Sequence, residues 1–261
     1  MTSRDALVEV RDLIKDFPGE KGGTVAAVTG VTFDILRGET FALAGESGGG
    51  KTTVGRMILG LIEPTAGRVL FDGREVTGLA PEAMRLLRRR MQMVFQNPLG
   101  ALNPRKTIAA SLELPLINFG TGSAGARRTR VAELLDMVGL EAGDGERYPH
   151  EFSGGQAQRI GIARALALEP DFIFLDEPVS ALDVSIQAQI LNLLKDLQER
   201  LGLTYLFVAH NLNVVQFMAD RSAIMRAGEI VEMGPTGELF RSPKGAYTRK
   251  LMSAILEPKT R

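Results

Sequence analysis

The chain has 261 residues, which exceeds a typical single domain and allows either one large domain or a core domain with a smaller lobe. With 44% hydrophobic residues, 24% charged residues and a mean hydropathy of +0.03, its composition is that of an ordinary soluble globular protein. Lysine plus arginine and aspartate plus glutamate both total 31, which excludes an overall basic charge that would attract nucleic acid.

Cysteine is absent, which excludes disulfides, thiolate metal sites and cysteine-ligated clusters and fits a reducing compartment such as the cytosol. The sequence begins "MTSRDALVEVRDL", without the apolar segment of a signal peptide. No apolar run reaches the roughly 18 residues that a membrane helix needs. We therefore expect any membrane role to depend on partner proteins.

The first part of the chain alternates β-branched runs with helical patterns, which predicts an α/β protein with much parallel sheet. Strands are expected at "ALVEVRDLIKDF", "VTFDI", "TFALAG" and "QMVFQ". From Lys51 to Ile62 the period is helical, with Met57, Ile58, Leu61 and Ile62 on one apolar side.

Residues 97–168 are mostly helical in pattern and are broken by a glycine-rich stretch at 120–125, which we interpret as an inserted helical lobe. Strand character returns in "DFIFLDE" and "TYLFVAH", apolar runs typical of buried parallel strands, with a long amphipathic helix between them. After His210 we expect a short helix, a hairpin around Ala227 and Gly228, and helical turns to Arg261.

The stretch "GESGGGKTT", from Gly45 to Thr53, fits the phosphate-binding pattern G-x-x-x-x-G-K-[ST] between a predicted strand and a predicted helix. Glycines let backbone N–H groups converge on phosphate oxygens, and the helix that follows presents its positive end to the same anion. Lys51 is expected to reach the β- and γ-phosphates and Thr52 to ligate Mg²⁺. The alternative, a glycine-rich turn without a ligand, does not explain the full match in this context.

Asp176 and Glu177 come at the carboxyl end of an apolar strand in "FIFLDEP". In a parallel sheet this end lies at the edge where the phosphate loop is expected. One carboxylate can bind Mg²⁺ through water, and the other can polarise an attacking water as a general base. The alternative is a solvated acidic turn, which would be the default without the phosphate loop.

A further motif, "SGGQAQRIGIARAL", places Ser153 where a helix N-cap would be, ahead of a helix with an apolar side. Ser-Gly-Gly at this helix start is a second candidate anion site, and a capped helix without a ligand is the alternative. A second site of this kind, in a separate lobe, suggests the hypothesis that the two sites meet across a dimer.

Five motifs occur in the order "GESGGGKT", "VFQNP", "FSGGQ", "FIFLDEPVSALD" and "VAHN". Together they resemble the nucleotide-binding subunit of an ABC transporter, and the resemblance covers nearly the whole chain. Three longer stretches look most like the importer branch that handles dipeptides, oligopeptides and nickel. They are "MQMVFQNPLGALNPRKT", "YPHEFSGGQAQRI" and "EPVSALDVSIQAQILNLL". The resemblance implies an α/β fold: a P-loop NTPase core with a mostly parallel sheet, an N-terminal antiparallel β portion and an inserted helical lobe. It implies one ABC ATPase domain over 1–261, with the core in 1–96 and 169–261 and the helical subdomain in 97–168.

The resemblance also assigns roles to single residues. Gln96 is similar to the Q-loop glutamine, and His210 to the switch histidine that contacts the γ-phosphate. Ser153 to Gln156 resemble the signature motif, which contacts ATP held by the opposing subunit, and Asp183 resembles the D-loop aspartate at the dimer interface. Phe17 could stack on adenine, and a core phenylalanine is the alternative.

The expected site is therefore as follows. The catalytic residues are Glu177, His210, Gln96 and Lys51, and Mg²⁺ is expected at Thr52, Gln96 and Asp176. The residues expected to bind ATP are Phe17, Gly45, Glu46, Ser47, Gly48, Gly49, Gly50, Lys51, Thr52, Thr53, Ser153, Gly154, Gly155, Gln156 and Asp183.

The function that this implies is ATP hydrolysis that powers uptake of peptides or a related small solute. The implied partners are a second ABC ATPase subunit, identical or different, two transmembrane permease subunits and an extracytoplasmic solute-binding protein, with no nucleic acid. The implied location is peripheral, on the cytoplasmic face of the cell (inner) membrane. The alternatives are a soluble ABC-type ATPase acting on nucleic acid or ribosomes, an importer ATPase for nickel or another non-peptide solute, and a module that binds ATP without hydrolysing it.

The chain departs from the family pattern at Phe152, where leucine is commoner, and at Ala157, where arginine or leucine is frequent. Asn211 replaces an aspartate, and Gly245-Ala246 stand where a His-Pro pair often precedes Tyr-Thr. We expect the first three changes to leave the function intact. The iron–sulfur cluster of longer members cannot carry over, because the chain has no cysteine.

Overall fold

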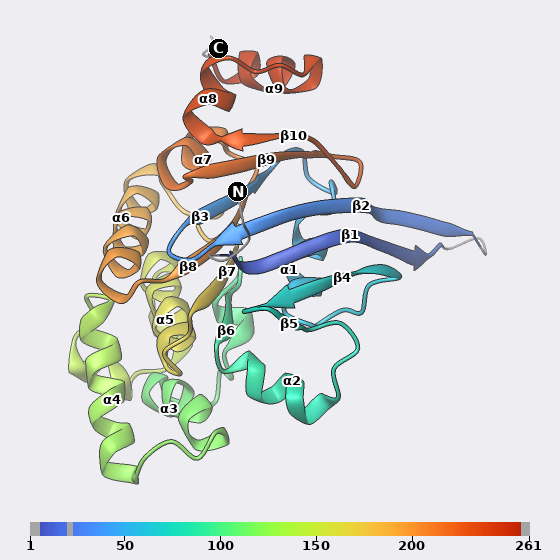
Figure 1. The fold of residues 1–261 in the computed structure, drawn as a ribbon. Helices are drawn as coiled ribbons and strands as arrows, with labels where there is room; N and C mark the ends of the chain where they lie inside the picture. The colour runs from blue at the N-terminus through green and yellow to red at the C-terminus, as the bar shows by residue number, and fades with distance from the viewer. Residues whose placement is uncertain (1–5, 20–22, 257–261) are drawn as a thin grey trace. The chain divides into compact units, whose positions relative to one another are not determined.

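The structure is a computed structural model that describes residues 6–19 and 23–256 (Figure 1). It divides into two compact units, which we call the first unit (Met1–Arg88 with Gly202–Arg261) and the second unit (Arg89–Leu201).

The first unit opens with an antiparallel sheet in the order β2-β1-β4-β5. Its strands are β1 (Ala6–Pro18), β2 (Thr24–Leu36), β4 (Ala66–Phe71) and β5 (Arg74–Glu75). Along β1 the apolar side chains of Val8, Val10 and Leu13 are buried, and the register shifts between Val10 and Leu13, where Asp12 has a φ of 47°. The bulge bends β1 locally, and the strand pairs with β2 along one edge and with β4 along the other. The predicted N-terminal antiparallel portion is confirmed.

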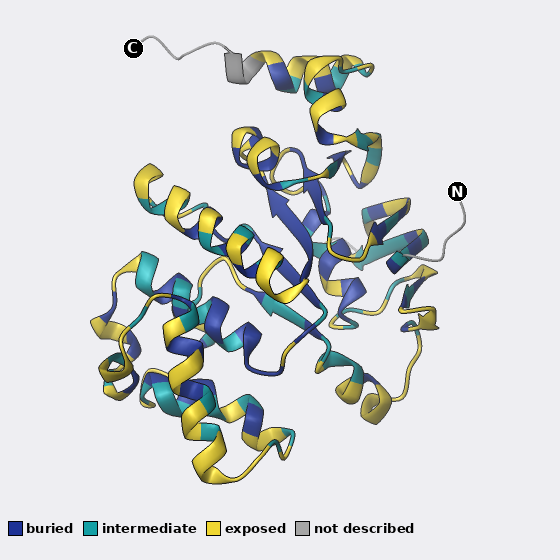
Figure 2. Ribbon diagram, turned by 60° about the vertical axis from the view of Figure 1, so that its left-hand side comes forward, coloured by how far each residue is buried: buried dark blue, intermediate teal, exposed yellow. Residues whose placement is uncertain are grey.

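A second set of strands in the first unit follows the order β10-β9-β3-β8, with β3 parallel to both β8 and β9. These strands are β3 (Thr40–Ala44), β8 (Thr204–Ala209), β9 (Arg221–Arg226) and β10 (Glu229–Pro235). Every residue of β3 and β8 is buried, as Figure 2 shows in dark blue. Such continuous apolar runs form strands that are covered on both faces, as predicted.

The helices of the first unit are α1 (Lys51–Ile58), α2 (Pro81–Arg88), α7 (Leu212–Met218), α8 (Thr236–Arg241) and α9 (Ala246–Leu256). The predicted hairpin after α7 is confirmed, with Ala227 (φ 48°) and Gly228 (φ 86°) turning β9 into β10. The predicted helical turns near the C-terminus correspond to α8 and α9, and residues 257–261 lie outside the described residues. The sequence patterns did not predict β4, β5 or α2.

The predicted helix from Lys51 to Ile62 was too long, because α1 ends at Ile58. Gly60 has a φ of 59°, and its N–H donates to the carbonyl of Met57 while the N–H of Leu61 donates to that of Arg56. This is the Schellman arrangement, in which a glycine in the left-handed region ends the helix. Leu61 is consequently 49% exposed and is not part of the buried side.

The second unit contains the parallel strands β6 (Met91–Val94) and β7 (Phe172–Asp176) and is otherwise helical. Its helices are η1 (Leu99–Ala101), α3 (Ile108–Asn118), α4 (Ala124–Met137), η2 (Ala142–Glu146), η3 (Pro149–Glu151), α5 (Gly154–Leu166) and α6 (Val184–Leu201). Leu112, Leu134 and Ile160 are fully buried where α3, α4 and α5 pack together. The predicted helical character and the long helix before β8 are confirmed.

Candidate phosphate-binding and catalytic site

The glycine-rich loop connects β3 to α1, and its shape requires glycine at two positions. Gly45 has a φ of 140° and Gly50 a φ of 91°, backbone conformations that side chains disfavour. A Cβ atom at Gly45 would lie 2.1 Å from the carbonyl oxygen of Met225, and one at Gly50 would lie 2.3 Å from that of Ala27. The loop therefore packs directly on neighbouring backbone, which holds it in one conformation.

Lys51 is 4% exposed, and its ammonium group lies within the curve of the loop. Its Nζ donates to the carbonyl oxygens of Gly45 (2.9 Å) and Glu46 (2.7 Å). A buried cation needs such polar partners, and these carbonyls keep it at the start of α1. Gly50, the N-cap of α1, offers no side chain to the first N–H groups of the helix. A buried cation and a helix N-terminus at one place suit an anion.

The other loop residues leave one side of the loop open. Glu46, Ser47 and Gly48 are exposed, and Thr52 and Thr53 are half-buried. On the opposite side the β9–β10 turn supports the loop, because Gly228 donates its N–H to the carbonyl of Gly49 over 3.3 Å.

His210 follows β8 directly and is exposed. Ala44, the last residue of β3, pairs in parallel with Ala209. The phosphate loop and His210 therefore leave adjacent strands at the same edge, where sites of such sheets form. Asn211 caps α7, since its side chain accepts the N–H of Asn213 over 3.0 Å. This capping role accounts for a short polar residue after His210.

Phe17 lies on β1 opposite Val25 and is half-buried. The Nζ of Lys15 is 5.1 Å from the centroid of its ring. A ring that is not enclosed is a poorer fit to the core alternative and keeps a face for stacking.

In the second unit, β7 carries the two carboxylates. Asp176 is 6% exposed at the end of the strand, and Glu177 follows with a φ of 48°. A non-glycine residue in this region costs about 1–3 kcal/mol, and such strain is concentrated at functional sites. The Nε2 of Gln96 lies 3.3 Å from the Oε2 of Glu177 and 3.1 Å from the Oγ of Ser180. The structure thus brings the predicted Gln96 and Glu177 together.

The signature-like stretch begins α5. Ser153 is the N-cap, as predicted, and Gln156 completes a capping box by accepting the Ser153 N–H over 3.1 Å. Gly154 is exposed, whereas a Cβ atom at Gly155 would lie 2.6 Å from Cγ2 of Ile186 on α6. Asp183, exposed just before α6, accepts the N–H of Gln187 with its carbonyl. The start of α5 therefore packs closely on α6.

Two departures from the family pattern have a structural reason. Phe152 is 8% exposed, and the guanidinium carbon of Arg147 lies 4.3 Å from the centroid of its ring. Ala157 is 1% exposed, in an enclosed position that suits a small side chain.

Ser180 was not predicted as a functional residue, although it lies within the "PVSALD" stretch. Its Oγ accepts a second hydrogen bond from Nε2 of Gln96 and also donates to the carbonyl of Glu177 over 3.1 Å. Its position in the sequence, three residues after Glu177 at the acidic end of a strand, could have indicated a role in the site.

Thr52 and Asp176 each carry side-chain oxygens, the donor type that hard divalent cations such as Mg²⁺ prefer. Among the described residues no group of three or more histidine or acidic side chains could hold a metal ion by itself.

No helix in 6–19 and 23–256 combines the length and the apolar character needed to cross a lipid bilayer.

Comparison with known proteins gives a consistent result. Residues 28–180 match the family model described as "ABC transporter". The chain is 52% identical to a putative peptide import ATP-binding protein of Brucella ovis over 97% of this chain and 79% of that protein. It is 50% identical to the oligopeptide transport ATP-binding protein OppF of Bacillus subtilis, over 97% and 84% of the two chains.

A solved dimeric ATP-binding cassette, in a post-hydrolysis state with ADP and Pi bound, superposes with a TM-score of 0.79 at 35% identity, over 88% of this chain and 98% of that one. The predicted fold class is thereby confirmed. The family model, these relatives and the phosphate loop, with its buried Lys51, lead to one assignment: the chain belongs to the ABC transporter family and is an ATP-hydrolysing subunit of that family.

Proposed function

We propose that this chain binds MgATP between its phosphate loop and the signature motif of a second ATPase subunit, and that hydrolysis powers import of peptides or a related small solute. The observation that carries the proposal is the phosphate loop itself. Its glycines and the buried Lys51 form an anion site at the N-terminus of α1. The relatives that resemble the chain are named for peptide and oligopeptide import.

The catalytic roles follow from the chemistry of each side chain. Lys51 neutralises charge on the β- and γ-phosphates, and the carbonyls of Gly45 and Glu46 hold its ammonium group in the loop. Glu177 polarises the attacking water as a general base, and Gln96 orients that carboxylate. His210 stabilises charge that develops on the γ-phosphate.

Magnesium would be held by Thr52 and by Asp176 through water, near Gln96, and would neutralise charge on the β- and γ-phosphate oxygens. These donor types are the reason for the assignment. The remaining positions of the loop, Gly45 to Thr53, would contact the phosphates through their N–H groups. Phe17 would stack on the adenine.

A second subunit would complete the site through Ser153, Gly154, Gly155 and Gln156. Ser153 and the two glycines form the N-terminus of α5, a helix of 13 residues whose dipole suits a phosphate. Asp183 would lie at the same interface. The solved cassette that resembles this chain is a dimer with ADP and Pi bound.

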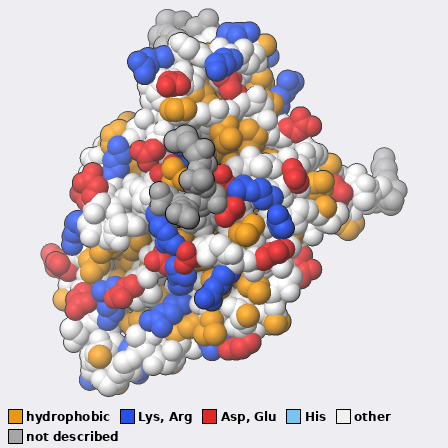
Figure 3. Space-filling view, in the orientation of Figure 1, with side chains coloured by type: hydrophobic (Ala, Val, Ile, Leu, Met, Phe, Trp, Pro, Cys, Tyr) orange, Lys and Arg blue, Asp and Glu red, His pale blue; other side chains and the backbone are white. Residues whose placement is uncertain are grey.

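We infer that the remaining partners are two transmembrane permease subunits and an extracytoplasmic solute-binding protein, and that the chain acts on the cytoplasmic face of the membrane. In this scheme residues 97–168 form a separate helical subdomain that transmits closure of the ATP site to the permease subunits. Basic and acidic side chains are interspersed on the face shown in Figure 3, and nucleic acid is not among the partners that we propose.

The first test is MgATP hydrolysis by the purified chain as a function of protein concentration. Turnover that rises more steeply than the concentration is expected for a dimeric site with two identical subunits. Proportional turnover at concentrations where the chain is monomeric by light scattering would indicate that single chains are competent and would contradict the shared site. If ATP binds without turnover at any concentration, the second ATPase subunit is a different chain. Adding ATPase chains that co-purify with the permease subunits then tests which of them restores turnover. Stimulation by peptide-loaded binding protein in reconstituted vesicles tests the substrate class, with a nickel-loaded binding protein as the comparison.

A further inference from the structure

A tyrosine near the C-terminus lies against the phosphate loop. Tyr247 is in the first turn of α9, and the guanidinium carbon of Arg226 lies 4.8 Å from the centroid of its ring. Arg226 is the last residue of β9, and the preceding Met225 is the residue whose carbonyl oxygen packs on Gly45. One short segment of β9 therefore touches both Tyr247 and the first glycine of the loop.

The phenol group of Tyr247 faces a residue of the loop itself. Its oxygen is buried, and within the described residues it lies close to Glu46 without a hydrogen bond of standard geometry. Burial raises the pKa of Tyr247, and the charge of the Glu46 carboxylate raises it further, while the Glu46 N–H and Arg226 act in the opposite direction. The neutral phenol, which can donate a proton to a carboxylate, is thus the form at neutral pH.

Glu46 connects this tyrosine to the lysine of the phosphate site. Its main-chain carbonyl accepts a hydrogen bond from Nζ of Lys51 over 2.7 Å. Its N–H and carboxylate lie by the phenol of Tyr247. A change in the position of Glu46 must therefore also move an oxygen that holds the ammonium group of Lys51.

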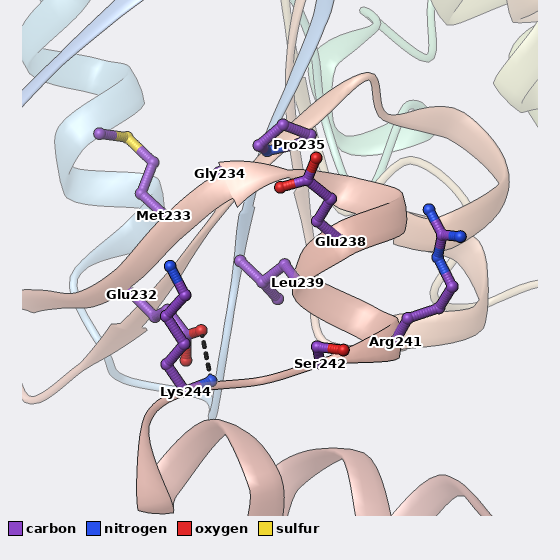
Figure 4. A pocket seen from close by; sticks show the side chains of 9 residues that line it. All are labelled: Glu232, Met233, Gly234, Pro235, Glu238, Leu239, Arg241, Ser242 and Lys244. Carbon is purple, nitrogen blue, oxygen red and sulfur yellow. Dashed lines mark hydrogen bonds between the residues drawn. The ribbon is translucent and has the colours of Figure 1, made fainter.

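The segment before Tyr247 is fixed by a carboxylate of β10. Glu232 accepts the N–H of Lys244 over 2.8 Å (Figure 4). It also accepts the N–H of Gly245 over 2.9 Å. A Cβ atom at Gly245 would lie 3.0 Å from Oε2 of Glu232, so a small residue favours this close approach. Thr248, the residue after Tyr247, is fully buried. The tyrosine is thus held on both sides along the chain.

We propose that Tyr247 is a positioning residue for the phosphate loop, which donates a hydrogen bond from its hydroxyl to the carboxylate of Glu46 and so sets the loop carbonyls that hold Lys51. The inference rests on the proposed function, because it assumes that this loop binds MgATP.

The contact can be tested without nucleotide. The chain has three tyrosines and no tryptophan, so tyrosine emission is directly measurable. A carboxylate that accepts the phenol proton quenches this emission. Glu46→Gln is expected to increase the emission of the wild-type chain and to leave that of Tyr247→Phe unchanged. Equal effects of Glu46→Gln in both backgrounds, or no effect in either, would overturn the proposal.

The consequence for the loop is tested by the affinity for a fluorescent ATP analogue with Mg²⁺. Tyr247→Phe is expected to weaken binding by about 3- to 10-fold, the effect of one hydrogen bond, with little change in kcat at saturating MgATP. In a Glu46→Gln background the same substitution should have no further effect. Lys250→Ala, an exposed position on the same helix, is the control and should bind as the wild type does.

The outcomes separate two kinds of failure. If wild type and Lys51→Ala bind the analogue equally poorly, the assignment of the phosphate loop fails. If the wild type binds and Tyr247→Phe binds equally well, only the role of Tyr247 fails. Suppose instead that Tyr247→Phe lowers kcat and thermal stability by the same amounts in the wild-type chain and in the Glu46→Gln background. That result would show a merely structural tyrosine and would also overturn the proposal.

Discussion

The Nε2 of Gln96 lies 3.3 Å from the Oε2 of Glu177, across 81 positions of sequence. Ser180 accepts from the same amide over 3.1 Å, so the glutamine side chain is held between the carboxylate and the turn that follows it. A general base must point at its water to be effective, and this pair of contacts orients the carboxylate.

We expect Gln96→Ala to lower kcat by about 10-fold, because Glu177 loses a charge-assisted hydrogen bond of about 1.5 kcal/mol. KM for MgATP should change less, since the phosphate loop is intact. Ser180→Ala should have a smaller effect in the same direction. Steady-state hydrolysis measures both, with Gln189→Ala on the exposed side of α6 as the control. An unchanged kcat in Gln96→Ala would remove the orienting role.

Glu177→Gln should retain nucleotide binding and lose turnover by about 10²- to 10⁴-fold, the usual contribution of a general base. The amide has nearly the same shape as the carboxylate but cannot accept a proton from water. Single-turnover hydrolysis and analogue binding, measured on the same preparation, separate the two properties. Glu199→Gln, at an exposed position on α6, should hydrolyse ATP as the wild type does. Wild-type turnover in Glu177→Gln would assign the base to another group.

Lys51→Ala should bind MgATP at least about 10-fold more weakly, since a lysine–phosphate interaction is charge-assisted. The readout is the shift of Tm on adding MgATP, because a ligand that binds only the folded state stabilises it. The wild type should show the shift and the variant should show little. Arg56→Ala, which removes an exposed cation from the same helix, controls for the loss of charge. An equal shift in Lys51→Ala would place the nucleotide elsewhere.

Gly45→Ala should destabilise the fold more than Gly73→Ala. Both glycines have positive φ, but a Cβ atom at Gly45 would lie 2.1 Å from a backbone oxygen, whereas one at Gly73 has nothing within 4 Å. Gly73→Ala should cost about 1–2 kcal/mol from the left-handed backbone alone. Denaturant unfolding of both variants gives the difference. Equal costs would mean that the loop moves easily away from Met225.

The contribution of Glu232 to stability should depend on pH. Burial alone would raise the pKa of its carboxyl group, but the nearby Thr248 hydroxyl and the hydrogen bonds from the N–H groups of Lys244 and Gly245 lower it below the ordinary 4.5. A carboxylate with a lowered pKa stabilises the fold above its unfolded pKa, and this contribution is lost as the pH falls through the folded value.

Wild type and Glu232→Gln should therefore differ most in stability at neutral pH and converge as the pH falls below about 4.5. Thermal unfolding across this range is the measurement, and Glu229→Gln, exposed on the same strand, is the control. A difference that stays constant down to about pH 3 would show that the effect of Glu232→Gln is not carried by the charge of Glu232.

Much of the site could be predicted because its signals are local. The spacing of Gly45, Gly50 and Lys51 between a strand and a helix indicates the phosphate loop, and Ser153 three residues before Gln156 indicates the capping box that the structure contains. The end of α1 could also have been predicted, because Gly60 stops the helix. The prediction extended the helix to Ile62 because the apolar period continues through Leu61 and Ile62.

By itself the sequence determined much of the order of strands and helices, the phosphate loop and the apolar runs that become buried strands. It also determined the N-cap at Ser153. These features depend on backbone conformation and on neighbours a few positions away. Tertiary structure alone decided that Gln96 meets Glu177 and that Tyr247 lies by Glu46. Those contacts join segments that are far apart along the chain. Their geometry depends on how strands pair and helices pack. The periodicity of a short stretch of sequence does not specify this long-range packing.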